Sequence, residues 1–100
     1  MYSQQVLIDT FGVPNPSAAQ IFNWKEEWAT ERANQRVKLR DVHLTDDDGN
    51  KIGSNTTNVR KCLKELEINP LFFHITYIDD SEPTLCFYNA EDVTLFKLST

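Results

Sequence analysis

The sequence predicts an α+β fold, with a three- to four-stranded, mostly antiparallel sheet and two helices packed on one face. Two runs rich in β-branched and aromatic residues, 71–78 and 84–89, flank a short polar stretch that ends in Pro83. This pattern is typical of an antiparallel hairpin. Two other segments carry helical spacing, and a strand-like run separates them. Because the strands gather towards the end of the chain, a parallel doubly wound sheet is not expected.

The length of 100 residues predicts one domain that spans residues 1–100. The hydrophobic share of 40% and the charged share of 25% are ordinary for a globular domain. No apolar run approaches the roughly 20 residues that a membrane-spanning helix needs, and the first residues lack the pattern of a signal peptide. We therefore expect a cytoplasmic protein with no membrane partner.

The first segment, residues 2–11, fits two interpretations. Residues 6–8 are apolar and fit a short buried strand, which is slightly favoured. Tyr2 and Phe11 also share helical spacing with these residues, and Gly12 is placed to end a helix. Strand and helix both remain open at this point.

The longest predicted helix runs from about Pro16 to Asn34. It has two candidate starts: Asn15 as an N-cap before Pro16, or Ser17 with Gln20 as a capping box. Its apolar residues form two sets, with cations between them. We expect one set to face the core and the other to be partly exposed.

Trp24 and Trp28 lie one helical turn apart in this helix, with Lys25 beside them. Tryptophan is among the residue types most enriched at binding hot spots, so both are candidate partner-binding residues. The other interpretation is that both pack under the sheet. The sequence leaves the two open.

Residues 37–44 alternate apolar and polar side chains, with a slip at Arg40–Asp41. The alternation predicts a strand, and the slip indicates a bulge or a register change. Residues 46–50 predict a turn because Asp48-Gly49 is a strong turn signal, and residues 51–53 fit a brief return strand.

A second helix follows, capped by Thr56 or Thr57 and ended by Asn69-Pro70. One face carries an apolar stripe, formed by Val59, Cys62, Leu63 and Leu66. The opposite face carries a basic cluster, formed by Arg60, Lys61 and Lys64. After the hairpin, residues 93–98 read as a third strand. Pairing Ile78 with Leu85 across the hairpin would place Cys86 opposite Tyr77.

No catalytic, metal-binding or cofactor-binding motif is present in the sequence, so we expect no enzyme. Cys86 lacks an adjacent base in the expected pairing, and His74 fits a hydrogen-bonded structural imidazole. An EF-hand loop starting at Asp46 would put Lys51 at the sixth position and Thr57 at the twelfth, which fails the calcium pattern. The two cysteines read as buried hydrophobes rather than a disulfide.

Charge is spread unevenly along the chain. The net charge is −5, and residues 65–100 alone carry −6, from seven acidic residues against Lys97. This distribution disfavours a general grip on nucleic-acid phosphates and favours a partner with a basic surface. The acidic candidates for partner contact lie in the expected turns: Asp79, Asp80, Glu82, Glu91 and Asp92.

From Gln4 to Trp24 the chain is similar to the helix-turn-helix of phage-type repressors. Leu7 and Phe11 would lie in a first helix, Gly12-Val13 at the turn, and Ala18 and Ile21 in a second helix. The resemblance implies a DNA-binding regulator that uses residues 4–28. It would place three side chains in the major groove of duplex DNA, those of Ser17, Gln20 and Asn23.

The leading hypothesis is a non-enzymatic, small acidic interaction protein that binds a basic surface of a larger protein. Small acidic proteins of this form include inhibitors and adaptors, among them phage-encoded proteins that act on nucleic-acid-handling proteins of the host. The helix-turn-helix regulator is the alternative.

Overall fold

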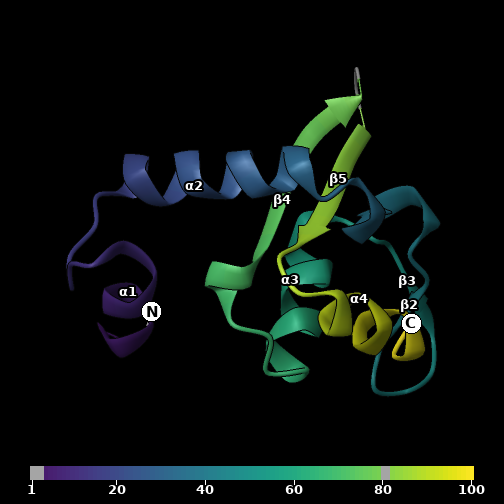
Figure 1. The fold of residues 1–100 in the computed structure, drawn as a ribbon. Helices are drawn as coiled ribbons and strands as arrows, with labels where there is room; N and C mark the ends of the chain where they lie inside the picture. The colour runs from purple at the N-terminus through teal and green to yellow at the C-terminus, as the bar shows by residue number, and fades with distance from the viewer. Residues whose placement is uncertain (1–3, 80–81) are drawn as a thin grey trace.

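The computed structural model describes residues 4–79 and 82–100, and it confirms the α+β class (Figure 1). A three-stranded antiparallel sheet has the order β1-β5-β4, and β2 and β3 form a separate two-stranded sheet. The strands are β1 Arg36–Lys38, β2 Leu44–Thr45, β3 Lys51–Ile52, β4 Phe73–Asp79 and β5 Glu82–Phe87. The helices are α1 Gln4–Phe11, α2 Ala18–Glu31, α3 Thr56–Glu65 and α4 Ala90–Leu98, with short 3-10 turns η1 Ala33–Gln35, η2 Leu39–Asp41 and η3 Pro70–Phe72.

The β4–β5 hairpin exists as expected, but its predicted register is wrong. Ile75 pairs with Leu85, and His74 rather than Tyr77 lies opposite Cys86. This register differs from the expected one by an odd number of residues, so it changes which side chains share a face. The observed register places apolar side chains together on one face of the sheet and places His74 and Cys86 together on the opposite face.

The apolar face of the sheet is covered by α3 and α4. Its strand residues Phe73, Leu85 and Phe87 are buried, and the helices contribute Val59, Leu63, Val93 and Phe96 to the same cluster. The rings of Phe87 and Phe96 are 5.6 Å apart. Two helices therefore pack on one face, as expected, but the pair is α3 with α4.

The predicted third strand at residues 93–98 is wrong, because this segment lies in α4. The central strand β5 already has β1 on one edge and β4 on the other, so no edge of it remains for a further strand. Val93 and Phe96, three residues apart, are both buried, as a helix would place them. Acidic residues in the first turn and Lys97 in the last turn suit the helix dipole.

Helix α2 covers the opposite face, crossing β4 and β5 (Figure 1). Trp28 and Ala29 pack against Cys86 there, and Glu26 contacts β4. The predicted helix over 16–34 is shorter at both ends. It starts from a capping box in which Ser17 and Gln20 bond to each other's backbone N–H, so the second of the two candidate starts is confirmed.

The described part of the first segment is helical, so the favoured strand interpretation is wrong there. Helix α1 ends at Gly12, whose φ of 76° is readily adopted by glycine and whose N–H donates to the Ile8 carbonyl at 2.8 Å. Leu7 is buried, and Phe11 contacts Trp24 in α2 with ring centroids 5.3 Å apart. A helix satisfies its own backbone hydrogen bonds, whereas a strand needs a sheet edge.

The expected strand over 37–44 is interrupted. The slip at Arg40–Asp41 lies in the turn η2 between β1 and β2. The turn at 46–50 is confirmed, because the Asp46 carboxylate accepts hydrogen bonds from the N–H groups of Asp48 and Asn50. Helix α3 is capped by Asn55, one residue before the expected threonines. Within the described residues, every helix is too short or too polar to cross a bilayer.

Candidate functional site

The predicted acidic residues fall into two groups at opposite ends of β5. Asp79 and Glu82 pair across the hairpin end, and Asp80 lies outside the described residues. Glu91 and Asp92 occupy the first turn of α4 rather than a turn beside the hairpin. β5 lies between the groups, and its six residues span about 17 Å at a rise of about 3.3 Å per residue. A single continuous acidic surface is therefore not formed by the described members.

The hairpin end carries both charge and an exposed aromatic ring. Tyr77 is 70% exposed, the largest such value among the exposed aromatic side chains of the described residues. The Glu82 carboxylate accepts a hydrogen bond from Arg40 Nη1 at 2.7 Å. Arg40 lies in η2, so this ion pair ties the hairpin to the turn after β1. It also offsets part of the negative charge of the hairpin end.

The predicted partner-binding tryptophans lie in an aromatic cluster. Trp28 is 3% exposed and Trp24 is half-buried. Trp24 contacts Trp28 and Tyr88, with ring centroids 5.9 and 5.2 Å away. The Arg32 guanidinium stacks 4.0 Å from the Tyr88 ring. The cluster holds α2 against the sheet, so the packing interpretation of the two tryptophans describes this structure.

Cys86 lies between two polar neighbours that the expected register did not place beside it. His74 faces it from β4, and Arg36 faces it from β1. The thiol is only 1% exposed, and burial raises the pKa of Cys86 to about 11, with Arg36 opposing the shift and Glu26 adding to it. A thiol that stays protonated at neutral pH is a poor nucleophile.

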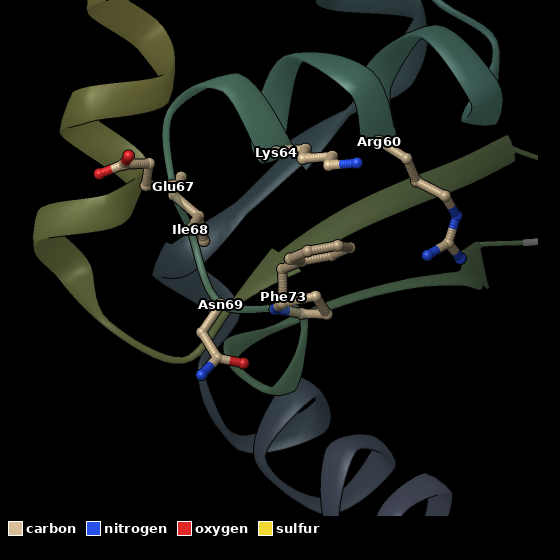
Figure 2. Close-up of a pocket in the computed structure, with 7 residues that line it drawn as sticks. Arg60, Lys64, Glu67, Ile68, Asn69 and Phe73 are labelled. Atoms are coloured by element: carbon tan, nitrogen blue, oxygen red, sulfur yellow. The ribbon is translucent and has the colours of Figure 1, made fainter. Parts of the chain in front are cut away.

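A pocket of about 620 Å³ opens between α3 and the start of β4 (Figure 2). Its lining combines cations from α3 with an apolar floor: Arg60, Lys64, Glu67, Ile68, Asn69, Pro70 and Phe73. The sequence predicted a basic cluster that contains Arg60 and Lys64, but its pattern gave no sign of the pocket. The floor comes from residues after the helix, which only tertiary packing brings beneath it.

Lys25 of α2 reaches the edge of this region. Its Nζ donates to the Pro70 carbonyl at 2.7 Å and lies 5.8 Å from the centroid of the Phe73 ring. Burial, and secondarily the nearby Arg60 guanidinium, lower the pKa of Lys25 to about 8. Lys25 and Arg60 therefore bring two cations close to the same aromatic ring.

The side chains assigned to DNA reading are partly committed elsewhere. Ser17 and Gln20 form the capping box of α2, while Asn23 is exposed. The connection between α1 and α2 has six residues, 12–17, and a helix-turn-helix uses three or four. This geometry gives no support to the regulator, which stays a prediction.

Comparison of the chain with protein-family models, curated proteins and solved structures finds no match in any of the three.

Proposed function

We propose that this chain is a non-enzymatic interaction protein of the cytoplasm that binds a basic surface of a larger protein, as an inhibitor or adaptor. The contact is the end of the β4–β5 hairpin. The observation that carries the proposal is the 70% exposure of Tyr77 beside the acidic residues of this end.

Tyr77 has the properties of an interface anchor. Tyrosine combines a large apolar ring with a hydroxyl and is enriched at interface hot spots. The hairpin extends past α2, away from α4 (Figure 1), and the exposed ring of Tyr77 is open to a partner. Anchoring by Tyr77 supplies the affinity in this proposal.

In this proposal, the charge of the hairpin end determines which partner is bound. The sequence places three acidic residues at 79–82, and Arg40 pairs with one of them, Glu82. The end of the hairpin is therefore net negative, which steers a partner with a basic surface. Glu91 and Asp92 lie in α4, beyond the other end of β5, so they are not part of the proposed contact. The two tryptophans pack against Cys86 and Tyr88 in the aromatic cluster and are not part of it either.

The buried position of Cys86 supports a non-enzymatic function. A catalytic cysteine needs a thiolate that substrate can reach, and this thiol is buried with a raised pKa. The His74 imidazole, which lies opposite, is engaged by Glu26.

The test compares partner capture by matched variants of the tagged protein. The partner is captured from a lysate of the source organism, purified, and titrated against wild type, Tyr77→Ala and a variant with Asp79, Asp80 and Glu82 changed to Lys. We expect each variant to raise the Kd at least tenfold, about 1.4 kcal/mol. The charge-reversed variant should also lose the dependence of association rate on salt.

Two controls carry matched changes at the other end of the sheet. Leu98→Ala removes an exposed apolar side chain from α4, and Glu91→Lys reverses a charge there. Both should bind within twofold of wild type. Unchanged affinity of Tyr77→Ala and of the charge-reversed hairpin, with folding verified by circular dichroism, would reject the hairpin as the contact.

A further inference from the structure

We propose that the pocket between α3 and β4 binds a small organic phosphomonoester, with the phosphate held by Arg60 and Lys64 and an apolar or aromatic body against the floor. This site is separate from the hairpin end, and it does not depend on the interaction proposed above.

Arg60 and Lys64 are placed to act together on one anion. They lie four residues apart on α3, so they share a face of the helix. Figure 2 shows their head groups on the same side of α3, in the region of the Phe73 ring. A guanidinium and an ammonium together provide the charge and the donors that a phosphate dianion needs.

These two cations are not neutralised by the described carboxylates. The ion pairs among the side chains of residues 4–77 and 82–100 involve Arg40 and His74, and none involves Arg60 or Lys64. Glu67 also lines the pocket, but Figure 2 shows its carboxylate turned away from both cations. The positive charge is therefore available to a ligand.

Two cations, Lys25 and Arg60, lie close to the Phe73 ring. Arg60 Cζ and Lys25 Nζ both lie 5.8 Å from its centroid, within cation–π distance. Burial, and secondarily the nearby Arg60 guanidinium, lower the pKa of Lys25 to about 8. A bound dianion would offset the positive charge that these cations bring together beside Phe73.

The size and the floor of the pocket define the rest of the ligand. A volume of about 620 Å³ exceeds what inorganic phosphate fills and falls in the range of small-molecule sites, roughly 300–1,000 Å³. Ile68, Pro70 and Phe73 make the floor apolar. Asn69 is held in place because its Oδ1 accepts a hydrogen bond from the Leu71 N–H at 2.9 Å.

The test uses phenyl phosphate as the probe. Calorimetry measures its affinity, and amide chemical shifts locate its binding site. We expect phenyl phosphate to bind at least tenfold more tightly than inorganic phosphate, which lacks the body, and than phenol, which lacks the charge. The shifted amides should lie in α3 and in residues 67–73. Equal affinity for phenyl phosphate and inorganic phosphate, or shifts located elsewhere, would overturn the proposal.

Variants separate this pocket from general attraction to positive charge. Arg60→Gln with Lys64→Gln should weaken phenyl phosphate binding at least tenfold, and both side chains are exposed, so the fold should survive. Lys61→Gln is the matched control, because Lys61 lies on α3 but lines a different hollow, beside Asp46. If Lys61→Gln weakens binding as much as the double variant does, the pocket is not the site.

Discussion

His74 in β4 and Glu26 in α2 join the sheet to the helix that crosses it. The imidazole Nε2 lies 2.9 Å from Glu26 Oε1, and the Thr76 hydroxyl donates to the same oxygen at 3.1 Å. His74 is buried, so this carboxylate satisfies a polar group that water barely reaches. The expectation that His74 is hydrogen-bonded is confirmed, and its structural role stays a prediction.

Glu26→Ala should lower the free energy of unfolding by about 1–3 kcal/mol, because it leaves a buried imidazole without its partner. Urea unfolding measures the change. Glu27→Ala is the control, since Glu27 is exposed on the same helix and should change stability by about 0.5 kcal/mol or less. Equal effects of the two substitutions would contradict a structural role for the Glu26–His74 contact.

Trp28→Ala should destabilise the protein by about 3–5 kcal/mol, because it removes a buried ring from the aromatic cluster. The indole N–H of Trp28 makes no hydrogen bond to the described residues, so Trp28→Phe should cost clearly less. Phe22→Ala tests an exposed aromatic on the same helix and should have a small effect. Thermal and urea unfolding rank the three, and a small loss for Trp28→Ala would place Trp28 outside the core.

Lys25 should make stability rise with pH. Its pKa is about 8 in the folded protein and 10.5 in the reference state, so the unfolded chain binds more protons between these values. The free energy of unfolding therefore rises with pH across this window. The gain is about 1 kcal/mol, because water screens this partly exposed amine.

Lys25→Met removes this contribution, so the free energy of unfolding of wild type should rise relative to that of the variant between pH 8 and 10.5. Urea unfolding at several pH values measures the difference. Lys61→Met, on the exposed face of α3, should instead run parallel to wild type. Parallel curves for Lys25→Met and wild type would show that the amine is not desolvated.

Cys86 should resist alkylation in the native state. Its thiol is buried and its pKa is raised to about 11, whereas Cys62 is only half-buried. Iodoacetamide at pH 8 should label Cys62 before Cys86 in the native protein. The two cysteines should be labelled at comparable rates only in denaturant, and mass spectrometry measures both rates. Rapid native labelling of Cys86 would mean that the sheet face beneath α2 opens readily.

The Cys86 thiol should change the free energy of unfolding with pH in the direction opposite to Lys25. A raised pKa means that the folded protein holds its proton longer than the unfolded chain does. The stability linked to Cys86 is therefore present below pH 9 and is lost as pH rises through about 11. Cys86→Ala should remove this loss.

Local sequence signals predicted several elements well. The Ser17–Gln20 capping box, the Asp46 turn and the stripe of α3 involve residues within a few positions of each other, and the structure contains all three. Such signals are readable because local hydrogen bonds and helical spacing need no distant partner.

The candidate sites depended on distant contacts. Arg40 reaches Glu82 across 42 positions of sequence, and this pair changes the charge of the hairpin end. The pocket needs Phe73 beneath Arg60, which the basic pattern of α3 alone does not contain. The acidic residues of the hairpin end and those of α4 are apart because β5 lies between them.

By itself, the sequence determined the α+β class, the central hairpin and the helices with clear caps. Only the tertiary structure decided that residues 93–98 form a helix, which buries Val93 and Phe96 in the core cluster against the sheet. It also set the hairpin register, since the chosen pairing places Ile75 with Leu85 on the face that α3 and α4 cover. Apolar segments of this length suit either a strand or a helix, and the available partner surface selects between them.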